Sequence, residues 1–267
     1  MISSSVKFLL NDKLIVIKNP DPNQTLLNYI RTELKKTGTK EGCSEGGCGA
    51  CTIVLGELVD NKIEYKAINS CISFVPTLNG KQLIIVEDLV SKNGQLHPVQ
   101  DAMVKFHGSQ CGFCTPGFVM SLFSMFKNNK SLNNELITDS ISGNLCRCTG
   151  YRPIIDAAKS LNKINKNDQF SKNKNKVIQQ LKKIKPKNVY IKKDDKIYFS
   201  PKNIKDLKGI IKKHSNFSFL AGGTDLSLKV TKERKEIPFI IDLKEINELD
   251  FIKVSKNYLE VGSATPL

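Results

Sequence analysis

Eight cysteines are the residues of this chain best suited to metal or redox chemistry, and they form two sets of four. The first set, Cys43, Cys48, Cys51 and Cys71, has the spacing C-x4-C-x2-C-x19-C. Four thiolates at this spacing hold the two irons of a plant-type [2Fe–2S] cluster. Glycines between them leave backbone N–H groups free to point at sulfur. We expect an iron–sulfur site here, the alternative being four buried structural cysteines beside a glycine-rich turn.

The second set, Cys111, Cys114, Cys146 and Cys148, reads C-x2-C followed by C-x-C. Paired cysteines at both ends indicate a four-thiolate metal site, but the spacing alone does not separate zinc from iron–sulfur. Pro116 is suited to the start of a helix, whose positive N-terminus favours thiolates, and Arg147 adds positive charge. We favour iron–sulfur, with zinc as the alternative.

The elements that must position these cysteines predict an α+β chain. Alternating residues 6–18 predict a hairpin, residues 25–37 an amphipathic helix, and residues 52–55, 66–72 and 82–86 short strands. From residue 97 the apolar period becomes helical, with helices expected near 99–106, 118–126, 135–141 and 154–161. We therefore assign a first domain to residues 1–90 and a helical domain to residues 91–162.

The remaining chain divides by charge. Nearly all of the net charge of +15 lies in residues 159–213, and we assign residues 163–195 to a solvated basic linker. Residues 196–267 show strands at 196–199, 216–220, 239–243 and 258–261 and a helix at 203–213, which predicts the opening of an α/β domain. No internal repeat is visible.

Composition argues against nucleic-acid-binding, membrane-spanning and secreted proteins. Arginine is scarce and no aromatic residues alternate with the lysines of the basic segment, so nucleic-acid binding is not expected. No apolar stretch has the roughly 20 residues that cross a bilayer, and residues 1–10 do not resemble a secretory signal. We expect a cytoplasmic protein without membrane contact, and in that reducing compartment cysteines bind metal more often than they form disulfides.

Four motifs together resemble the iron–sulfur portion of the xanthine dehydrogenase and molybdenum hydroxylase family. They are EGCSEGGCGAC at 41–51, NSC at 69–71, QCGFCTPG at 110–117 and NLCRCTGYRP at 144–153. The resemblance covers about residues 5–160 and includes all eight cysteines in order. It implies a ferredoxin-like β-grasp domain around the first set and a four-helix domain around the second, each holding a [2Fe–2S] cluster. It also implies that the helical-domain cluster lies nearest the molybdopterin, approached by Gln110, and that the ferredoxin-type cluster lies on the flavin side.

The C-terminal third extends the resemblance. The segment Phe219, Leu220, Ala221, Gly222, Gly223, Thr224, Asp225 and Leu226 is similar to the family's flavin pyrophosphate loop, and VGSAT at 261–265 is similar to its second phosphate-side turn. Glycines let backbone N–H groups approach phosphate. Because the family's flavin domain continues beyond this point, we expect the sequence to end within the FAD-binding domain, either as a fragment or as a truncated gene product. FAD is therefore expected as a cofactor of the family's complete flavin domain, and its binding is not assumed for this chain by itself.

The resemblance implies an oxidoreductase subunit that passes electrons from a molybdopterin centre on a large partner subunit to FAD and then NAD, as in xanthine dehydrogenase. No residue of this chain is expected to be a catalytic acid, base or nucleophile, and His97, His107 and His214 are interpreted as packing or surface residues. Two alternatives remain at this point. The chain is either part of a related hydroxylase acting on aldehydes, carbon monoxide or nicotinate-type rings, or a freestanding iron–sulfur carrier or metal-binding interaction module.

Overall fold

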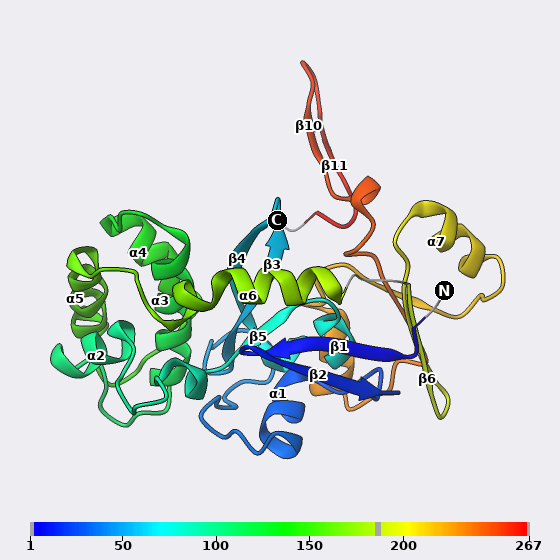
Figure 1. Ribbon diagram of the computed structural model, residues 1–267. Helices are drawn as coiled ribbons and strands as arrows, with labels where there is room; N and C mark the ends of the chain where they lie inside the picture. The colour runs from blue at the N-terminus through cyan, green and yellow to red at the C-terminus, as the bar shows by residue number, and fades with distance from the viewer. Residues whose placement is uncertain (1–2, 185–187, 266–267) are drawn as a thin grey trace.

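The computed structural model describes residues 3–184 and 188–265. A five-stranded sheet of order β2-β1-β5-β3-β4 lies at the centre (Figure 1). Its strands are β1 Ser5–Leu10, β2 Lys13–Lys18, β3 Thr52–Val59, β4 Lys62–Asn69 and β5 Gln82–Ile84. The hairpins β1–β2 and β3–β4 are antiparallel, and β5 joins them by pairing parallel to β1. The first helical segment, α1 Leu26–Asn28 continued by η1 Tyr29–Glu33, packs on one face, which gives the β-grasp arrangement expected from the resemblance.

The two faces of this sheet are buried against different parts of the chain. Side chains alternate along a strand, so Phe8 of β1 joins the core under α1 whereas Leu9 joins the core of the helical part. That part consists of α2 Pro98–Lys105, α3 Thr115–Asn128, α4 Asn134–Ile141 and α5 Arg152–Ser160, close to the expected helices. Helix α3 is buried along most of its length because it packs on β3 and β4 as well as on its neighbouring helices.

Two expected strands end earlier than the apolar pattern suggests. The strand expected at residues 66–72 ends at Asn69, and the 3-10 turn η2 Ser70–Ile72 follows. The strand expected at 82–86 likewise gives way to η4 Val86–Leu89. Burial in a turn requires the same apolar residues as burial in a strand, so the pattern does not separate them. The first correction matters because η2 presents Cys71.

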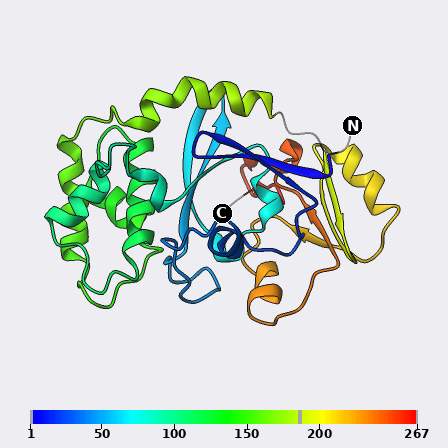
Figure 2. The same cartoon turned by 60° about the horizontal axis from the view of Figure 1, so that its bottom comes forward.

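The segment expected to be a solvated linker contains an ordered helix, α6 Gln169–Lys183. Phe170, Val177 and Leu181 are buried at helical spacing, and the many Lys and Asn residues between them obscure that period in the sequence. The helix passes across the sheet from the helical part (Figures 1 and 2). At its middle Lys176 pairs with Asp12 of the β1–β2 turn at 2.8 Å, so α6 ties the helical part to the sheet.

The third part begins before its expected start at residue 196, because β6 Val189–Lys193 already belongs to its sheet. The order is β6-β7-β9-β8, with β7 Lys196–Ser200, β8 Ser218–Leu220 and β9 Phe239–Asp242, and its helices are α7 Ile204–Ile211 and α8 Leu226–Thr231. The hairpin of β10 Ile252–Val254 and β11 Leu259–Val261 projects away from the body (Figure 1). The remaining 3-10 turns are η3 Val75–Leu78, η5 Leu161–Lys163 and η6 Asn247–Leu249.

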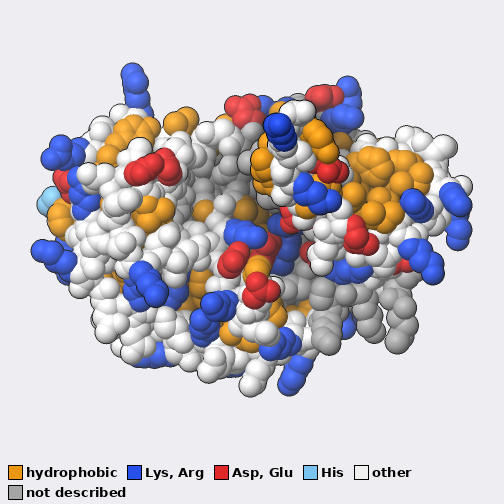
Figure 3. All heavy atoms as spheres, turned by 90° about the horizontal axis from the view of Figure 1, so that it is seen from above, with side chains coloured by type: hydrophobic (Ala, Val, Ile, Leu, Met, Phe, Trp, Pro, Cys, Tyr) orange, Lys and Arg blue, Asp and Glu red, His pale blue; other side chains and the backbone are white. Residues whose placement is uncertain are grey.

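One face of the molecule carries its positive charge in a dispersed form (Figure 3). On the face seen in Figure 3, lysine and arginine side chains are spread among apolar and acidic ones and form no single basic patch. No helix in residues 3–184 or 188–265 has the length and apolar character to span a bilayer.

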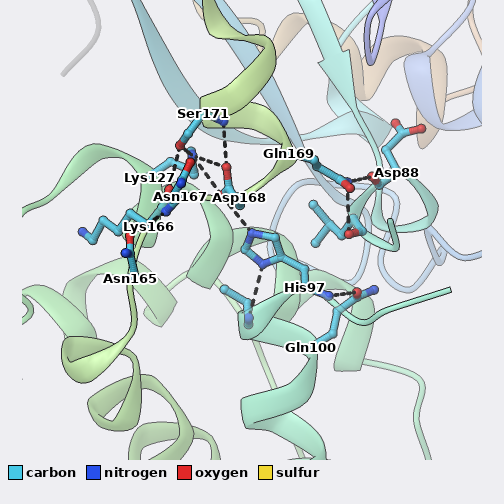
Figure 4. A network of polar contacts seen from close by, with 12 residues as sticks. Asp88, His97, Gln100, Lys127, Asn165, Lys166, Asn167, Asp168, Gln169 and Ser171 are labelled. Atoms are coloured by element: carbon cyan, nitrogen blue, oxygen red, sulfur yellow. Dashed lines mark hydrogen bonds and ion pairs between the residues drawn. The ribbon is translucent and has the colours of Figure 1, made fainter. Parts of the chain in front are cut away.

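A buried polar network fixes the start of α6 (Figure 4). Asp168 accepts hydrogen bonds from Lys127 Nζ at 2.8 and 2.9 Å and from the Ser171 backbone N–H at 2.7 Å, which makes it the N-cap of the helix. His97 Nδ1 accepts from the Val99 N–H, so its Nε2 carries the proton and donates to Asp168 at 3.1 Å. His97 is thus a packing residue, as expected from the sequence, and α2, α3 and α6 meet at one carboxylate.

We predict that this carboxylate makes stability depend on pH. Burial would raise the pKa of Asp168, but hydrogen bonds from His97 and Lys127 outweigh it and hold that pKa well below its ordinary range. The stabilisation is therefore complete above the unfolded-state pKa of about 4 and is lost as the pH falls further. Asp168→Asn keeps the helix cap but leaves Lys127 unneutralised, and should lower the free energy of unfolding at pH 7 by about 3 kcal/mol.

Urea unfolding from pH 7 to pH 2 measures both effects. The variant should lose less stability than the parent below about pH 4. Asp139→Asn, on the exposed surface of α4, is the matched control. Equal acid sensitivity of the parent and Asp168→Asn would contradict the assignment.

Candidate metal and flavin sites

The first cysteine set is brought together by one loop and one turn. Cys43 and Cys48 lie half-buried in the loop before β3, Cys51 directly precedes that strand, and Cys71 lies on η2. The thiols contact one another in pairs, Cys43 with Cys48 and Cys51 with Cys71. The second pair is almost completely buried. The structure thus brings the four predicted residues together as two pairs, on the loop before β3 and the adjoining turn.

Backbone N–H groups point at these sulfurs. Cys43 Sγ accepts from the N–H groups of Cys48 at 3.3 Å and Glu45 at 3.5 Å, and Cys48 Sγ accepts from that of Cys43 at 3.4 Å. The Cys71 thiol donates toward Cys51, which lowers the pKa of Cys51 to about 7 although burial opposes the shift, and the same contact together with burial raises the pKa of Cys71. Such donors stabilise thiolate, the form that binds metal.

The second cysteine set lies at the end of the helical part. Cys114 is the N-cap of α3, as the position of Pro116 predicts, and Cys146 and Cys148 precede α5. Contacts again run in pairs, Cys111 with Cys148 and Cys114 with Cys146. The pair of Cys111 and Cys148 is exposed, whereas Cys146 Sγ contacts the Thr149 hydroxyl at 3.1 Å.

The donor sets fit binuclear clusters. Each iron of a [2Fe–2S] cluster takes two thiolates, so four cysteines arranged as two pairs match its needs. Among the described residues, no three His, Cys, Asp or Glu side chains are grouped as they would be around one metal ion. Eight free thiols in pairs are the residues that could hold such clusters, and the sulfurs of Cys43, Cys48 and Cys146 receive N–H or O–H contacts.

The two cysteine loops touch each other directly. The carbonyl oxygen of Cys48 accepts a hydrogen bond of 3.0 Å from the N–H of Leu145, the residue before Cys146. Beside it, buried Asn144 donates to the Gly49 carbonyl at 3.0 Å and accepts from the Ser121 hydroxyl at 2.6 Å. A Cβ on Gly49 would lie 2.3 Å from the Gly143 carbonyl, so only glycine permits this approach. The backbone segments at residues 48–49 and 143–145 therefore form a common wall between the two sites.

The flavin-type segment, residues 219–226, forms the end of β8 and the loop leading to α8. Gly222 and Thr224 are exposed, and a Cβ on Gly222 would meet nothing within 4 Å, so the loop is open on that side. Gly223 adopts φ +90° and faces Leu220, Ser227 and the carbonyl of Ile72, the residue after Cys71, instead. The loop has the exposure that a phosphate-binding loop requires, and it lies next to η2.

The second flavin-type turn, residues 261–265, is occupied by internal bonds. The N–H groups of Gly262 and Ala264 donate to the carbonyls of Phe251 and Leu249 at 2.8 and 2.9 Å. The Thr265 hydroxyl bonds the backbone of Phe251. These groups stabilise the base of the β10–β11 hairpin.

Sequence reasoning did not single out three residues that connect the sites. Asn144 joins the two cysteine loops, and Ser227 and Lys232 join α8 to the first set. Their partners are 95, 155 and 189 positions away along the chain, so no local pattern reveals these contacts, even for Asn144, which begins the motif at 144–153. Gln110 is exposed beside Cys111, His107 is exposed, and the His214 ring packs edge-on against Phe239 with 5.0 Å between ring centroids.

Three family models match the chain in order. A 2Fe-2S iron-sulfur cluster binding domain matches residues 8–76, a [2Fe-2S] binding domain residues 85–159, and the FAD binding domain in molybdopterin dehydrogenase residues 190–267. The chain therefore contains two [2Fe–2S]-binding domains and FAD-binding-domain sequence. The zinc alternative for the second set is thereby disfavoured.

Curated relatives agree with these matches. Xanthine dehydrogenase of Blastobotrys adeninivorans is 52% identical over 159 residues, 58% of this chain and 11% of that protein. Human aldehyde oxidase is 44% identical over 160 residues, 59% of this chain and 12% of that protein. The chain thus spans about one eighth or less of the length of these relatives.

A solved structure, that of quinoline 2-oxidoreductase from Pseudomonas putida 86, resembles this chain at 30% identity and a TM-score of 0.50. The likeness covers 68% of this chain and 98% of that one. With three family models matched along the chain and a 30% identical relative covered almost completely, the chain belongs to the molybdenum hydroxylase family that includes xanthine dehydrogenase and aldehyde oxidase.

Proposed function

We propose that this chain transfers single electrons between a molybdopterin centre and a flavin through two [2Fe–2S] clusters. The metal ligands in this proposal are Cys43, Cys48, Cys51 and Cys71 at one site and Cys111, Cys114, Cys146 and Cys148 at the other. The observation that supports it most is the 3.0 Å bond from the Leu145 N–H to the Cys48 carbonyl. This hydrogen bond links the residue before Cys146, a proposed ligand of the second site, with Cys48, a proposed ligand of the first site.

The second cysteine set, the first set and the flavin-type loop follow one another in an order that suits electron transfer. The exposed pair Cys111 and Cys148 stands at the outer end, and the contact of Leu145 with Cys48 leads from the second set to the first. At the inner end, buried Cys71 lies beside Ile72, whose carbonyl contacts α8 behind the flavin-type loop. A bound [2Fe–2S] cluster supplies one-electron transfer at each position. The chain's residues hold these positions in order and shield the inner pair from water.

The outer end is suited to a partner that carries the molybdopterin. Phe113 and Leu145, two apolar residues beside the second cysteine set, are 49% and 58% exposed. Exposed apolar side chains beside a functional site favour protein contact. Gln110 is exposed next to Cys111 and is proposed to face the pterin. The inner end, residues 219–226, is proposed to contact FAD, with NAD as the acceptor of the whole enzyme.

Within the family we propose the xanthine dehydrogenase type, located in the cytoplasm. The 52% identity to one xanthine dehydrogenase supports the first choice, while other xanthine dehydrogenases, at 44–47%, overlap the aldehyde oxidases, at 44–46%. Eight free thiols support a reducing compartment. The aldehyde oxidase type is the second candidate because its members match a similar share of the chain. NAD-dependent oxidation of xanthine by the enzyme assembled with its molybdenum partner separates the two.

We predict that the chain purified without oxygen contains about four iron atoms, as two binuclear clusters require. Reduction with dithionite should produce two distinct electron paramagnetic resonance signals. Metal analysis and spectroscopy of one sample measure both. A chain that carries zinc in the second site, or no iron after preparation with its partner, would contradict the proposal.

Single ligand substitutions should remove one signal at a time. Cys148→Ser removes a thiol of the exposed pair, so we expect the second site to lose its signal while the first keeps its own. Cys48→Ser should have the reciprocal effect, because Cys48 belongs to the other set. Low-temperature spectra of the two variants make the comparison. If either substitution abolished both signals, the sites would not be separate.

Asn144→Ala should loosen the wall between the sites without removing a ligand. It leaves the buried Ser121 hydroxyl without its acceptor, which costs about 2 kcal/mol of unfolding free energy. It also removes the donor that ties the second loop to the Gly49 carbonyl, which keeps its bonds from Thr52. The magnetic interaction between the two reduced clusters should weaken as the loops separate. Both readouts should stay unchanged in the control Asn134→Ala at the exposed start of α4. If the magnetic interaction were unchanged in Asn144→Ala, the wall between the sites would not determine the distance between the clusters.

A further inference from the structure

Helix α8 lies between the flavin-type loop and the first cysteine set, and it contacts that set at two points. In Figure 2 the helix, drawn in orange, lies beside the blue loop that precedes β3. Nothing in the proposed electron path requires these contacts, since α8 provides no metal ligand. They are therefore a feature that needs its own explanation.

The first contact comes from Ser227, which is completely buried. Its hydroxyl donates a hydrogen bond of 2.7 Å to the carbonyl of Ile72, the residue after Cys71. A Cβ placed on Gly223 would lie 3.4 Å from the same carbonyl and 3.3 Å from Ser227 Oγ. Because Gly223 has no side chain, the loop and the cysteine turn are in direct contact around this bond.

The second contact comes from Lys232, the C-cap residue of α8. Its ammonium donates to the Cys43 carbonyl at 2.9 Å and pairs with Glu45 at 3.1 Å. Cys43 and Cys71 belong to different thiol pairs of the same set. One short helix and its cap therefore contact segments that carry both halves of the proposed cluster site.

We infer that α8 sets the reduction potential of the ferredoxin-type site, with Lys232 providing positive charge and Ser227 positioning the Cys71 turn. The inference rests on the proposed function. Reduction adds one electron and so one negative charge to the site, with no bond made or broken and no proton required. A cation next to the Cys43 carbonyl favours the more negative state, and a hydroxyl that donates toward the site acts in the same direction.

Glu45 allows the inference to be tested by the direction in which the reduction potential shifts. Its carboxylate is on the same loop and paired with Lys232, so its charge opposes that of the ammonium. Both side chains are about half exposed, at 46% and 48%, so salt should screen their influence. If the ion pair were purely structural, removing either charge would shift the reduction potential in the same direction. If the pair acts electrostatically, removing the Lys232 charge and removing the Glu45 charge shift the potential in opposite directions.

The experiment is a potentiometric titration of the iron-loaded full chain, with dithionite as reductant and ferricyanide as oxidant, followed by electron paramagnetic resonance. Lys232→Met should lower the midpoint potential of the ferredoxin-type signal, and Glu45→Gln should raise it. Both shifts should shrink in high salt. The signal of the second site serves as an internal reference and should not move. Lys229→Met, an exposed lysine on the same helix, is the matched control and should leave both potentials unchanged.

Ser227→Ala tests the positioning role separately. It should lower the same potential and change the shape of the ferredoxin-type signal, because the Cys71 turn loses its hydrogen bond. Thermal unfolding of the variant is measured in parallel. Loss of thermal stability with an unmoved potential and signal would overturn the role of Ser227.

The remaining outcomes separate the inference from the function on which it rests. Two loaded clusters whose potentials do not respond to Lys232→Met, or that shift in the same direction for Lys232→Met and Glu45→Gln, would overturn the inference alone. A chain without iron would overturn the proposed function and the inference together.

Discussion

The close approach of two backbone segments at Gly49 is the constraint on which the arrangement of the cysteine sites depends. A side chain at this position would collide with the Gly143 carbonyl, which lies 2.3 Å from where its Cβ would stand. Without one, the Cys48 carbonyl reaches the Leu145 N–H and Asn144 closes the remaining gap. Two loops separated by about one hundred residues thus become neighbours through hydrogen bonds rather than through a shared ligand.

The scaffold beneath these loops maintains that approach. Helix α3 is capped by Cys114 at one end, and near its other end Ser124 and Asn128 bond the backbone of Tyr65 in β4. The strand β3 begins one residue after Cys51. Both cysteine sets are therefore attached to the ends of elements that pack on each other. Such attachment positions a site more accurately than a loop supported only by itself.

The sequence contained most of the elements and all eight cysteines in their two sets, because ligand spacing and apolar period are local properties. The metal-ligand roles of those cysteines stay a prediction. The sequence did not reveal α6, whose three buried apolar residues are separated by lysines and asparagines typical of a solvated segment. It also could not reveal Asn144, Ser227 or Lys232, since each is defined by a partner that only tertiary packing supplies. The sequence also did not reveal the turn η2, because its buried residues follow the same apolar pattern as those of a strand.

The course of α6 has a consequence for kinetics. Its first turn is fixed to α2 and α3 through Asp168, and Lys176 and Gln180 bond Asp12 at the tip of the β1–β2 hairpin. A brace attached on both sides opposes hinge bending between the helical and ferredoxin-like parts. With clusters bound at both proposed sites, the distance between them would be set when the chain folds, so passage of an electron would be governed by fixed geometry and driving force instead of by movement of one part against the other.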